Sequence, residues 1–211
     1  MANLHDIVQW CNQTLKANEF KDYAPNGLQI EGKTEVRKIL AAVTASQDAI
    51  DAAIRENADL LLVHHGYFWK GENACVVGMK KNRLKALLMN DISLLAYHLP
   101  LDAHHELGNN VQLAKKLGLG IAEPLYPENP KQVGNIAVLD EPMSAEDFSL
   151  LCERVLGQKP MHIAGANQFI KTIGFCTGAA QGFIEQAVVM GCDAYLSGEI
   201  SEPTVHTARE T

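Results

Sequence analysis

The sequence predicts an α/β fold with two similar halves, each built on a mainly parallel sheet flanked by helices. One observation is that short apolar segments alternate with amphipathic ones along the chain. Another is that the apolar segments are continuous runs, as in strands that are buried on both faces of a sheet. The composition agrees, because 47% of the 211 residues are apolar and 20% are charged, which is typical of a globular protein with a core.

The first half is expected to alternate helices and strands from its N-terminus. Apolar residues recur at helical spacing from Leu4 to Leu15, and Asn3 is placed to cap that helix. The Pro and Asn-Gly content of residues 22–27 predicts a turn. The elements expected after this turn are strands at 38–44, 60–63 and 93–98, and helices that begin at Ser46, span 78–90 and span 109–117.

The composition changes around residues 122–132, where three prolines in seven residues predict a boundary. We therefore expect a first α/β half at 1–124 and a second at 125–211. The second half is expected to contain strands at 134–139, 171–176 and 194–197, and helices that begin at Ser144, at Ala180 and near Pro203. Segments 57–64 and 191–198 share the order helix end, Asp, strand and polar site. This order suggests an internal duplication, although unrelated strand–helix–strand units share much of it.

The charge and the cysteines exclude several classes of protein. The net charge is −7 and the pI is near 5.6, which argues against non-specific binding to phosphate backbones. No stretch is long and apolar enough for a membrane span, and the N-terminus lacks the features of a signal peptide. The five cysteines are widely spread, without a CxxC pair, so we expect reduced thiols and a cytoplasmic location. The sequence shows no P-loop, GxSxG elbow or dinucleotide fingerprint.

His64 and His65 come directly after an apolar strand and are followed by Gly66. Open α/β sheets place their sites at the carboxyl ends of strands. Adjacent side chains of a strand point to opposite faces, so both rings can serve one site only if the strand ends there. Neutral imidazoles are good ligands of divalent transition metals. The alternative is two unrelated histidines, one packed and the other in solvent.

The segment from His98 to Asp102 ends the next strand. Pro100 argues against a helix here, so we expect an extended strand exit. Asp102 can then supply an oxygen ligand beside the histidine doublet, and such mixtures are used by iron, manganese and zinc hydrolytic sites. The alternative for Asp102 is a turn or a helix cap. By position alone, His98 and His104 are candidates for a general acid.

Other residues near the strand ends are weaker candidates. A solvent-exposed loop is the simpler interpretation of residues 104–106, and an exposed helical pair is the simpler interpretation of Glu202 and His206. The aromatic run 67–69 is expected to line a pocket or a subunit contact, with base stacking as the alternative. Two further candidates are Glu199, at the last strand end, and Lys70, for a phosphate.

Several blocks of the sequence carry a family resemblance. They are Asp22-Tyr23-Ala24-Pro25-Asn26-Gly27-Leu28-Gln29, Val63-His64-His65-Gly66-Tyr67-Phe68-Trp69, His98-Leu99-Pro100-Leu101-Asp102-Ala103-His104, Thr177-Gly178 and Leu196-Ser197-Gly198-Glu199. Together they resemble the Nif-three-like family, YbgI type, whose members are known as GTP cyclohydrolase I type 2 homologs. The resemblance spans essentially the whole chain. It implies the Nif-three-like fold with two similar α/β halves, a dinuclear metal site, and a homohexameric ring whose metal sites face an internal cavity.

The resemblance also implies which residues bind the metals. His64, His65 and Asp102 fall on ligand positions for two divalent metal ions, with iron, zinc and manganese as the candidates. The family's two remaining ligands, a His and a Glu, belong to a C-terminal Gly-His-His-x-Thr-Glu block that these 211 residues do not contain. We therefore expect the chain to be a shortened form of a longer protein. Three ligands plus water can still hold one ion.

The function expected from the resemblance is a metal-dependent hydrolase. Two ions about 3.5–4 Å apart would activate a water for attack on a nucleotide-type substrate, and in the GTP cyclohydrolase reaction this attack falls on C8 of guanine. The first alternative is a metal-handling protein without turnover, such as a metallochaperone or regulator. The second is a ring that encloses nucleic acid, against which the negative charge counts. A small-molecule substrate and a self-assembled ring are the expected partners, without a membrane.

Overall fold

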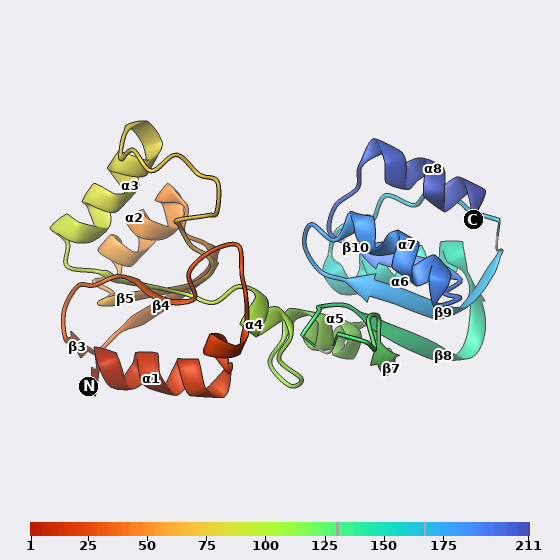
Figure 1. The fold of residues 1–211 in the computed structure, drawn as a ribbon, viewed down its shortest axis with the longest axis horizontal. Coiled ribbons are helices and arrows are strands. Elements are labelled where there is room, and N and C mark those ends of the chain that lie inside the picture. Colours follow the sequence, from red (N-terminus) through yellow and green to blue (C-terminus); the bar gives the residue numbers. More distant parts are fainter. Residues whose placement is uncertain (130, 167) are drawn as a thin grey trace. The chain divides into compact units, whose positions relative to one another are not determined.

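The computed structural model describes residues 1–129, 131–166 and 168–211 and confirms the α/β class. The chain divides into two compact units, Met1–Leu101 and Asp102–Thr211 (Figure 1). The division falls before the predicted boundary at 124/125, because the first strand after Asp102 pairs with its successor inside the second unit. Within the predicted linker, Pro130 lies outside the described residues.

The first unit is built on a four-stranded sheet in the order β2-β6-β5-β4. Strands β4, β5 and β6 are parallel to one another, and β2 joins the edge antiparallel to β6. The prediction of a mainly parallel sheet is therefore confirmed in this unit. Its elements are β1 (Ala2–Asn3), α1 (Leu4–Thr14), the 3-10 helix η1 (Ala17–Glu19), β2 (Gly27–Ile30), β3 (Glu35–Val36), β4 (Ile39–Thr44), α2 (Gln47–Arg55), β5 (Leu60–His65), α3 (Gly78–Met89) and β6 (Ser93–Ala96).

Helices cover both faces of this sheet, as the continuous apolar strands predicted. Leu61 of β5 and Leu94 of β6 point into a cluster that α2 and α3 close. Their neighbours Leu60 and Leu95 point the other way, into a cluster that α1 closes, and Figure 1 shows α1 on the opposite side of the sheet from α2 and α3. Alternate residues of one strand thus serve two cores, and the strand ends remain at the rim between them.

The second unit has a sheet in the order β10-β9-β8-β7. Only β9 and β10 are parallel among the described pairs, whereas β7–β8 and β8–β9 are antiparallel. The sheet of this unit is therefore mixed and not mainly parallel as predicted. The short connection between β7 and β8 leaves no room for a crossover helix, which accounts for that pair. The elements are α4 (Leu99–Asp102, which spans the division), α5 (Asn109–Leu117), β7 (Gly120–Pro124), β8 (Asn135–Ser144), α6 (Ala145–Leu156), β9 (Phe169–Cys176), the 3-10 helix η2 (Gln181–Phe183), α7 (Ile184–Val189), β10 (Ala194–Ser197) and α8 (Glu202–Glu210).

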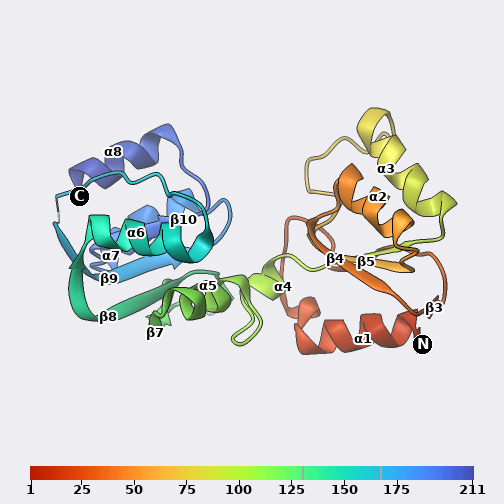
Figure 2. The ribbon, with the colours of Figure 1, turned by 180° about the vertical axis from the view of Figure 1, so that it is seen from behind.

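Two layers of helix also enclose the second sheet. Leu117 of α5 and Phe148 of α6 pack with Phe175 of β9 on one face. Ala187 of α7 packs with Ile136 of β8 on the other face. Figure 1 shows α7 in front of this sheet, and Figure 2, seen from behind, shows α6 in front. No helix in the described ranges is long and apolar enough to cross a membrane.

The segment 99–102 is a short helix, α4, and not the extended exit that Pro100 predicted. The reason is position within the helix. Proline is excluded from helix interiors because it lacks an N–H and clashes with the preceding turn, but the first turn tolerates it. The predicted cap at Asn3 is confirmed, and Ser46 and Ser144 cap the helices that were expected to begin at them. Each side chain accepts a hydrogen bond from a backbone N–H of its helix.

The two strand–helix–strand segments share one pattern of hydrogen bonds from backbone N–H groups to an aspartate side chain. Asp59, before β5, accepts hydrogen bonds from the N–H groups of Arg37 (2.9 Å) and Lys38 (3.2 Å). Asp193, before β10, accepts bonds of 2.9 Å each from the N–H groups of Lys171 and Thr172. In both segments the aspartate carboxylate thus ties the start of its own strand to the start of the preceding parallel strand. This shared detail agrees with the predicted likeness of segments 57–64 and 191–198.

Each of these two aspartates is expected to stabilise its own unit. Replacing Asp59 or Asp193 by alanine leaves two backbone N–H groups without their acceptor, at a cost of about 1–3 kcal/mol in the free energy of unfolding. Amide hydrogen exchange should accelerate at Arg37 and Lys38 in Asp59→Ala, and at Lys171 and Thr172 in Asp193→Ala. Asp59→Asn, which retains one acceptor oxygen, is the matched control. Equal exchange in Asp59→Ala and the wild type would contradict this role.

Candidate metal centre

Three histidine rings of the first unit form one cluster. His64 and His65 end β5, and His98 follows β6 by two residues. Parallel pairing of Val63 with Ala96 brings these strand ends side by side. One ligand nitrogen from each ring lies within 4.8 Å of the other two, and the ring centroids are 4.5–5.7 Å apart. Both rings of the predicted doublet therefore lie in one cluster, and the structure adds His98 to it.

Each imidazole of the cluster is anchored through its Nδ1 atom. His64 Nδ1 lies 2.9 Å from the carbonyl oxygen of Tyr97, and His65 Nδ1 lies 3.3 Å from the hydroxyl of Thr44, its partner in the β4–β5 pairing. A carbonyl can only accept, so His64 carries its hydrogen on Nδ1. His98 Nδ1 lies 2.7 Å from a carboxylate oxygen of Asp22. Anchors at Nδ1 make Nε2 the nitrogen with which each ring would bind a metal.

Asp22 is a buried carboxylate that faces His98, and only 2% of its side chain is exposed. Burial alone would raise the pKa of Asp22. Hydrogen bonds from His98, from the Asn26 amide and from two backbone N–H groups outweigh burial and lower this pKa from 3.8 to about 2. Asp22 is therefore ionised at neutral pH, so it accepts the hydrogen of His98 Nδ1.

The turn after the doublet is packed against β2 and β6. Gln29 of β2 accepts a 2.7 Å bond from the N–H of Tyr67 and donates to the carbonyl of the same residue at 3.2 Å. Gly66 is buried against Gln29 and Ala96, so it has no room for a side chain. Trp69 follows the turn, and its ring meets that of His98 edge-on at 5.0 Å. Of the aromatic run, Trp69 thus lies beside the cluster, and its expected part in a pocket or a subunit contact stays a prediction.

These three rings fit a divalent transition metal. Neutral imidazoles are ligands that zinc, iron and manganese use, and a tetrahedral ion with bonds of about 2.1 Å separates its nitrogen ligands by about 3.4 Å. The observed limit of 4.8 Å is within reach of that spacing after small side-chain movements. The anchored Nδ1 atoms meet the further requirement that each ligating ring be oriented from behind.

Asp102, the predicted oxygen ligand, begins the second unit. Its Oδ1 accepts a 2.7 Å hydrogen bond from the side chain of Asn109. The buried Asn110 contacts the Asp102 carbonyl at 3.5 Å, and its own Oδ1 accepts a 2.8 Å bond from the N–H of Thr177 after β9. Asp102 is thus fixed to α5 and to the end of β9, and its part in metal binding stays a prediction.

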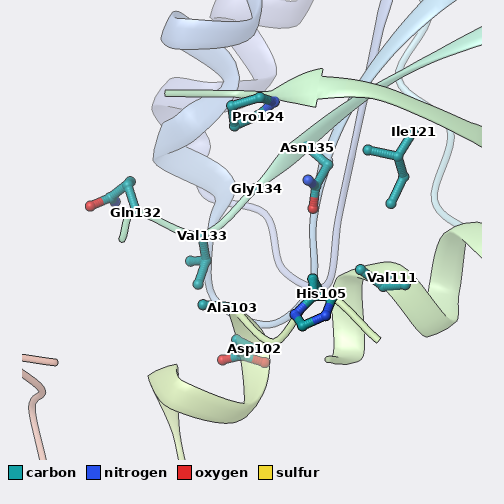
Figure 3. A pocket seen from close by; sticks show the side chains of 10 residues that line it. All are labelled: Asp102, Ala103, His105, Val111, Ile121, Pro124, Gln132, Val133, Gly134 and Asn135. Atoms are coloured by element: carbon teal, nitrogen blue, oxygen red, sulfur yellow. The ribbon is translucent and has the colours of Figure 1, made fainter. Parts of the chain in front are cut away.

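A cavity of about 290 Å³ in the second unit has Asp102 in its wall. Figure 3 shows Asp102 and His105 on one side of it and Pro124 on the other. This volume is at the low end of the roughly 300–1,000 Å³ typical of small-molecule sites. The described lining contains neither lysine nor arginine, so it offers no cation for a triphosphate. The lining residues are Asp102, Ala103, His105, Val111, Ile121, Pro124, Gln132, Val133, Gly134 and Asn135.

The weaker candidates lie outside the histidine cluster. His104 Nδ1 accepts bonds from the N–H groups of Glu106 and Leu107, both at 3.1 Å, so this ring closes a turn and the nitrogen that accepts them cannot carry a proton. Residues 105–107 are exposed, as expected of a loop. Glu202 and His206 pair at 3.1 Å on the surface of α8, with side chains 80% and 57% exposed. Glu199 and Lys70 are exposed as well.

The comparisons with known proteins agree with the resemblance. A family model described as Duf34/NIF3 (NGG1p interacting factor 3) matches residues 2–211. A Pseudomonas aeruginosa protein named GTP cyclohydrolase 1 type 2 homolog is 56% identical over 98% of this chain and 82% of its own length. An Escherichia coli protein of the same name is 47% identical over 97% of this chain and 81% of its own.

Solved structures show the same likeness. The structure of protein ybgI, described as of unknown function, has a TM-score of 0.93 at 44% identity and covers 98% of this chain and 82% of its own. A Thermus thermophilus protein has a TM-score of 0.85 at 32% identity, over 98% of this chain and 81% of its own. The chain belongs to the DUF34/NIF3 family.

Proposed function

We propose that this chain binds divalent transition metals at the histidine cluster and acts as a metal-dependent hydrolase. The observation that carries the proposal is the convergence of His64, His65 and His98 within 4.8 Å, each ring being anchored through Nδ1. The doublet and Asp102 are the proposed metal ligands, and His98 is a third imidazole donor. Two ions, the number implied by the resemblance, remain part of the proposal.

The chemistry that a bound divalent ion supplies is Lewis acidity, which lowers the pKa of water toward about 7 and polarises a substrate carbonyl or phosphoryl group. The residues of the chain hold and orient the nitrogen donors. Trp69 packs edge-on against one side of His98. His98 is better suited to a ligand than to a general acid, because its Nδ1 hydrogen is held by Asp22, which leaves Nε2 as the donor nitrogen. The other candidate acid, His104, uses its Nδ1 to close a turn.

The proposed substrate is a nucleotide-type small molecule. The reason is the name of the relatives, which are GTP cyclohydrolase 1 type 2 homologs. The cavity beside Asp102 has amide and carboxylate groups that suit the edge of a heterocycle, and apolar walls that suit its faces. It lacks cations in its described lining, so triphosphate binding needs groups from elsewhere. A homohexameric ring is the proposed assembly.

The test is the metal content of purified chain after loading with Zn²⁺, Mn²⁺ or anaerobic Fe²⁺ and desalting, measured by elemental mass spectrometry. Wild-type chain is expected to retain metal, and His65→Ala is expected to lose most of it, because one of the converging donors is gone. His105→Ala is the matched control, since this ring is exposed and outside the cluster. Retention of equal metal by His65→Ala, or none by the wild type, would overturn the proposal.

Metal handling without turnover is the competing function, because it would use the same ligands. The rate of metal release to a chelator separates the two, together with hydrolysis assays on a panel of nucleotides. A hydrolase is expected to release metal slowly and to convert at least one nucleotide in a His65-dependent manner. Fast release without conversion would favour the metallochaperone or regulator.

A further inference from the structure

We propose that Asp22, itself held by Asn26, is a positioning residue that fixes His98 in the tautomer with hydrogen on Nδ1 and so presents Nε2 to the cluster. The turn at residues 22–27 would then be part of the metal centre, although it binds no metal itself. As far as metal affinity is concerned, this inference rests on the proposed function. The tautomer itself belongs to the metal-free chain.

Asp22 accepts hydrogen bonds from its own turn and from the exit of β6. Oδ1 accepts from His98 Nδ1 at 2.7 Å and from the N–H of Tyr23 at 2.6 Å. Oδ2 accepts from Asn26 Nδ2 at 2.9 Å and from the N–H of Leu99 at 2.9 Å. Each oxygen therefore has two donors, which leaves the carboxylate little freedom to rotate.

Asn26 completes the arrangement by holding the backbone of the same histidine. Its Oδ1 accepts a 2.8 Å bond from the N–H of His98, while its Nδ2 donates to Asp22. His98 is thus gripped at its backbone by Asn26 and at its ring by Asp22. Both contacts come from one turn, so the backbone and the ring of His98 are held against the same segment. Rotation of the imidazole about χ1 or χ2 would break the bond at Nδ1.

The acceptor behind His98 differs from those behind the other two rings. Tyr97 offers a neutral carbonyl to His64, and Thr44 offers a hydroxyl to His65, whereas Asp22 offers a full negative charge. A carboxylate behind a ligating imidazole fixes the ring orientation and increases the basicity of the other nitrogen. His98 is therefore the ring of the cluster with the most strongly directed lone pair. A hydrogen bond that only stabilised the fold could be made by a neutral acceptor, as it is at His64 and His65.

The first test is the ¹⁵N NMR spectrum of the metal-free chain at neutral pH, with His98 assigned by its loss in His98→Ala. The wild type is expected to show a protonated Nδ1 and an unprotonated Nε2 at this ring. In Asp22→Asn the amide can donate as well as accept, so the His98 signals should shift toward the Nε2–H form or an average of both. Asp59→Asn is the matched control, because Asp59 is a carboxylate of the same unit whose hydrogen bonds go to backbone N–H groups and a lysine.

The second test is a double-mutant cycle on Zn²⁺ affinity, with Asp22→Asn and His98→Ala alone and combined. Asp22→Asn is expected to weaken binding about 10–100-fold. In the His98→Ala background it should change affinity by no more than about twofold, the usual error of such cycles. Asp59→Ala should leave affinity unchanged while it lowers stability, which separates positioning from general loosening of the fold.

The outcomes distinguish this inference from the function on which it rests. An Nε2–H tautomer of His98 in the wild type would overturn the positioning role, whatever the metal affinity. Equal effects of Asp22→Asn with and without His98 would also overturn it, because the carboxylate would then act by another route. If wild-type chain binds no Zn²⁺ while its tautomer is as expected and responds to Asp22→Asn, the proposed metal function fails and the positioning of His98 stands.

Discussion

Replacement of Asp22 by alanine is expected to lower the free energy of unfolding of the first unit by about 3 kcal/mol, because a hydrogen bond to a charged group contributes about 1.5–3 kcal/mol. The variant leaves four donors without their acceptor, of which two are the N–H groups of Tyr23 and Leu99. Urea denaturation followed by far-UV circular dichroism measures the change. Asp51→Ala is the control, because this exposed aspartate accepts one side-chain bond on the surface of α2.

The pH dependence of this difference provides an independent measurement. Because the native pKa of Asp22 is about 2 and its ordinary value is 3.8, its carboxylate contributes full stability above about pH 4. That contribution, about 2 kcal/mol, is lost as the pH falls through about 2. The gap in stability between wild type and Asp22→Ala should therefore narrow in this window. A gap that stays constant from pH 5 to pH 2 would contradict the ionised, hydrogen-bonded carboxylate.

Replacement of Gly66 by alanine is expected to destabilise the first unit by about 3 kcal/mol, at the upper end of the usual cost of overpacking. The added Cβ would overlap Gln29 Oε1 and lie 2.6 Å from the Cβ of Ala96. Neither neighbour can move cheaply. Gln29 is held by bonds to Tyr67 and Pro25, and Ala96 is part of the central strand β6. Relief must come from the turn itself, so His65 should be displaced and metal affinity reduced.

Gly182→Ala is the matched control for this variant. Gly182 also has an ordinary φ, and an added Cβ there would meet no atom within 4 Å, so its stability should stay within about 0.5 kcal/mol of the wild type. Thermal unfolding and Zn²⁺ titration of both variants make the comparison. Normal stability and affinity in Gly66→Ala would mean that the turn after the doublet is looser than its packing indicates.

Much of the fold follows from local sequence. The run from Leu60 to Val63 could be read as a buried strand, because a strand with helices on both faces needs apolar side chains on both. β7 could not be read in this way. Its residues Gly120–Pro124 are exposed and include a glycine and a proline, and only its pairing with β8 makes it a strand. The antiparallel pairs of the second sheet were missed for the same reason, since pairing is a non-local property.

The residues of the candidate site also differ in whether local sequence identifies them. His64 and His65 were identified because they are adjacent and sit at a strand end. The role of Asp22 depends on a partner 76 residues away, and its sequence context, a turn rich in Pro and Asn-Gly, gives a sufficient local reason for an aspartate. The local sequence therefore predicts a turn at Asp22 and gives no sign of its contact with His98. His98 was considered only as an acid, because the expected extended exit at Pro100 directed attention to Asp102.

The anchors of the three imidazoles also order events during synthesis of the chain. A nascent polypeptide that ends at Lys70 displays both doublet histidines, but the Tyr97 carbonyl that anchors His64 is not yet made. Asp22, although translated early, waits for His98. The centre can therefore assemble only after β6 has left the ribosome and paired with β5. For the proposed metal site, uptake of an ion is therefore expected to follow folding of the first unit, the reverse of small zinc modules, whose folding requires the ion.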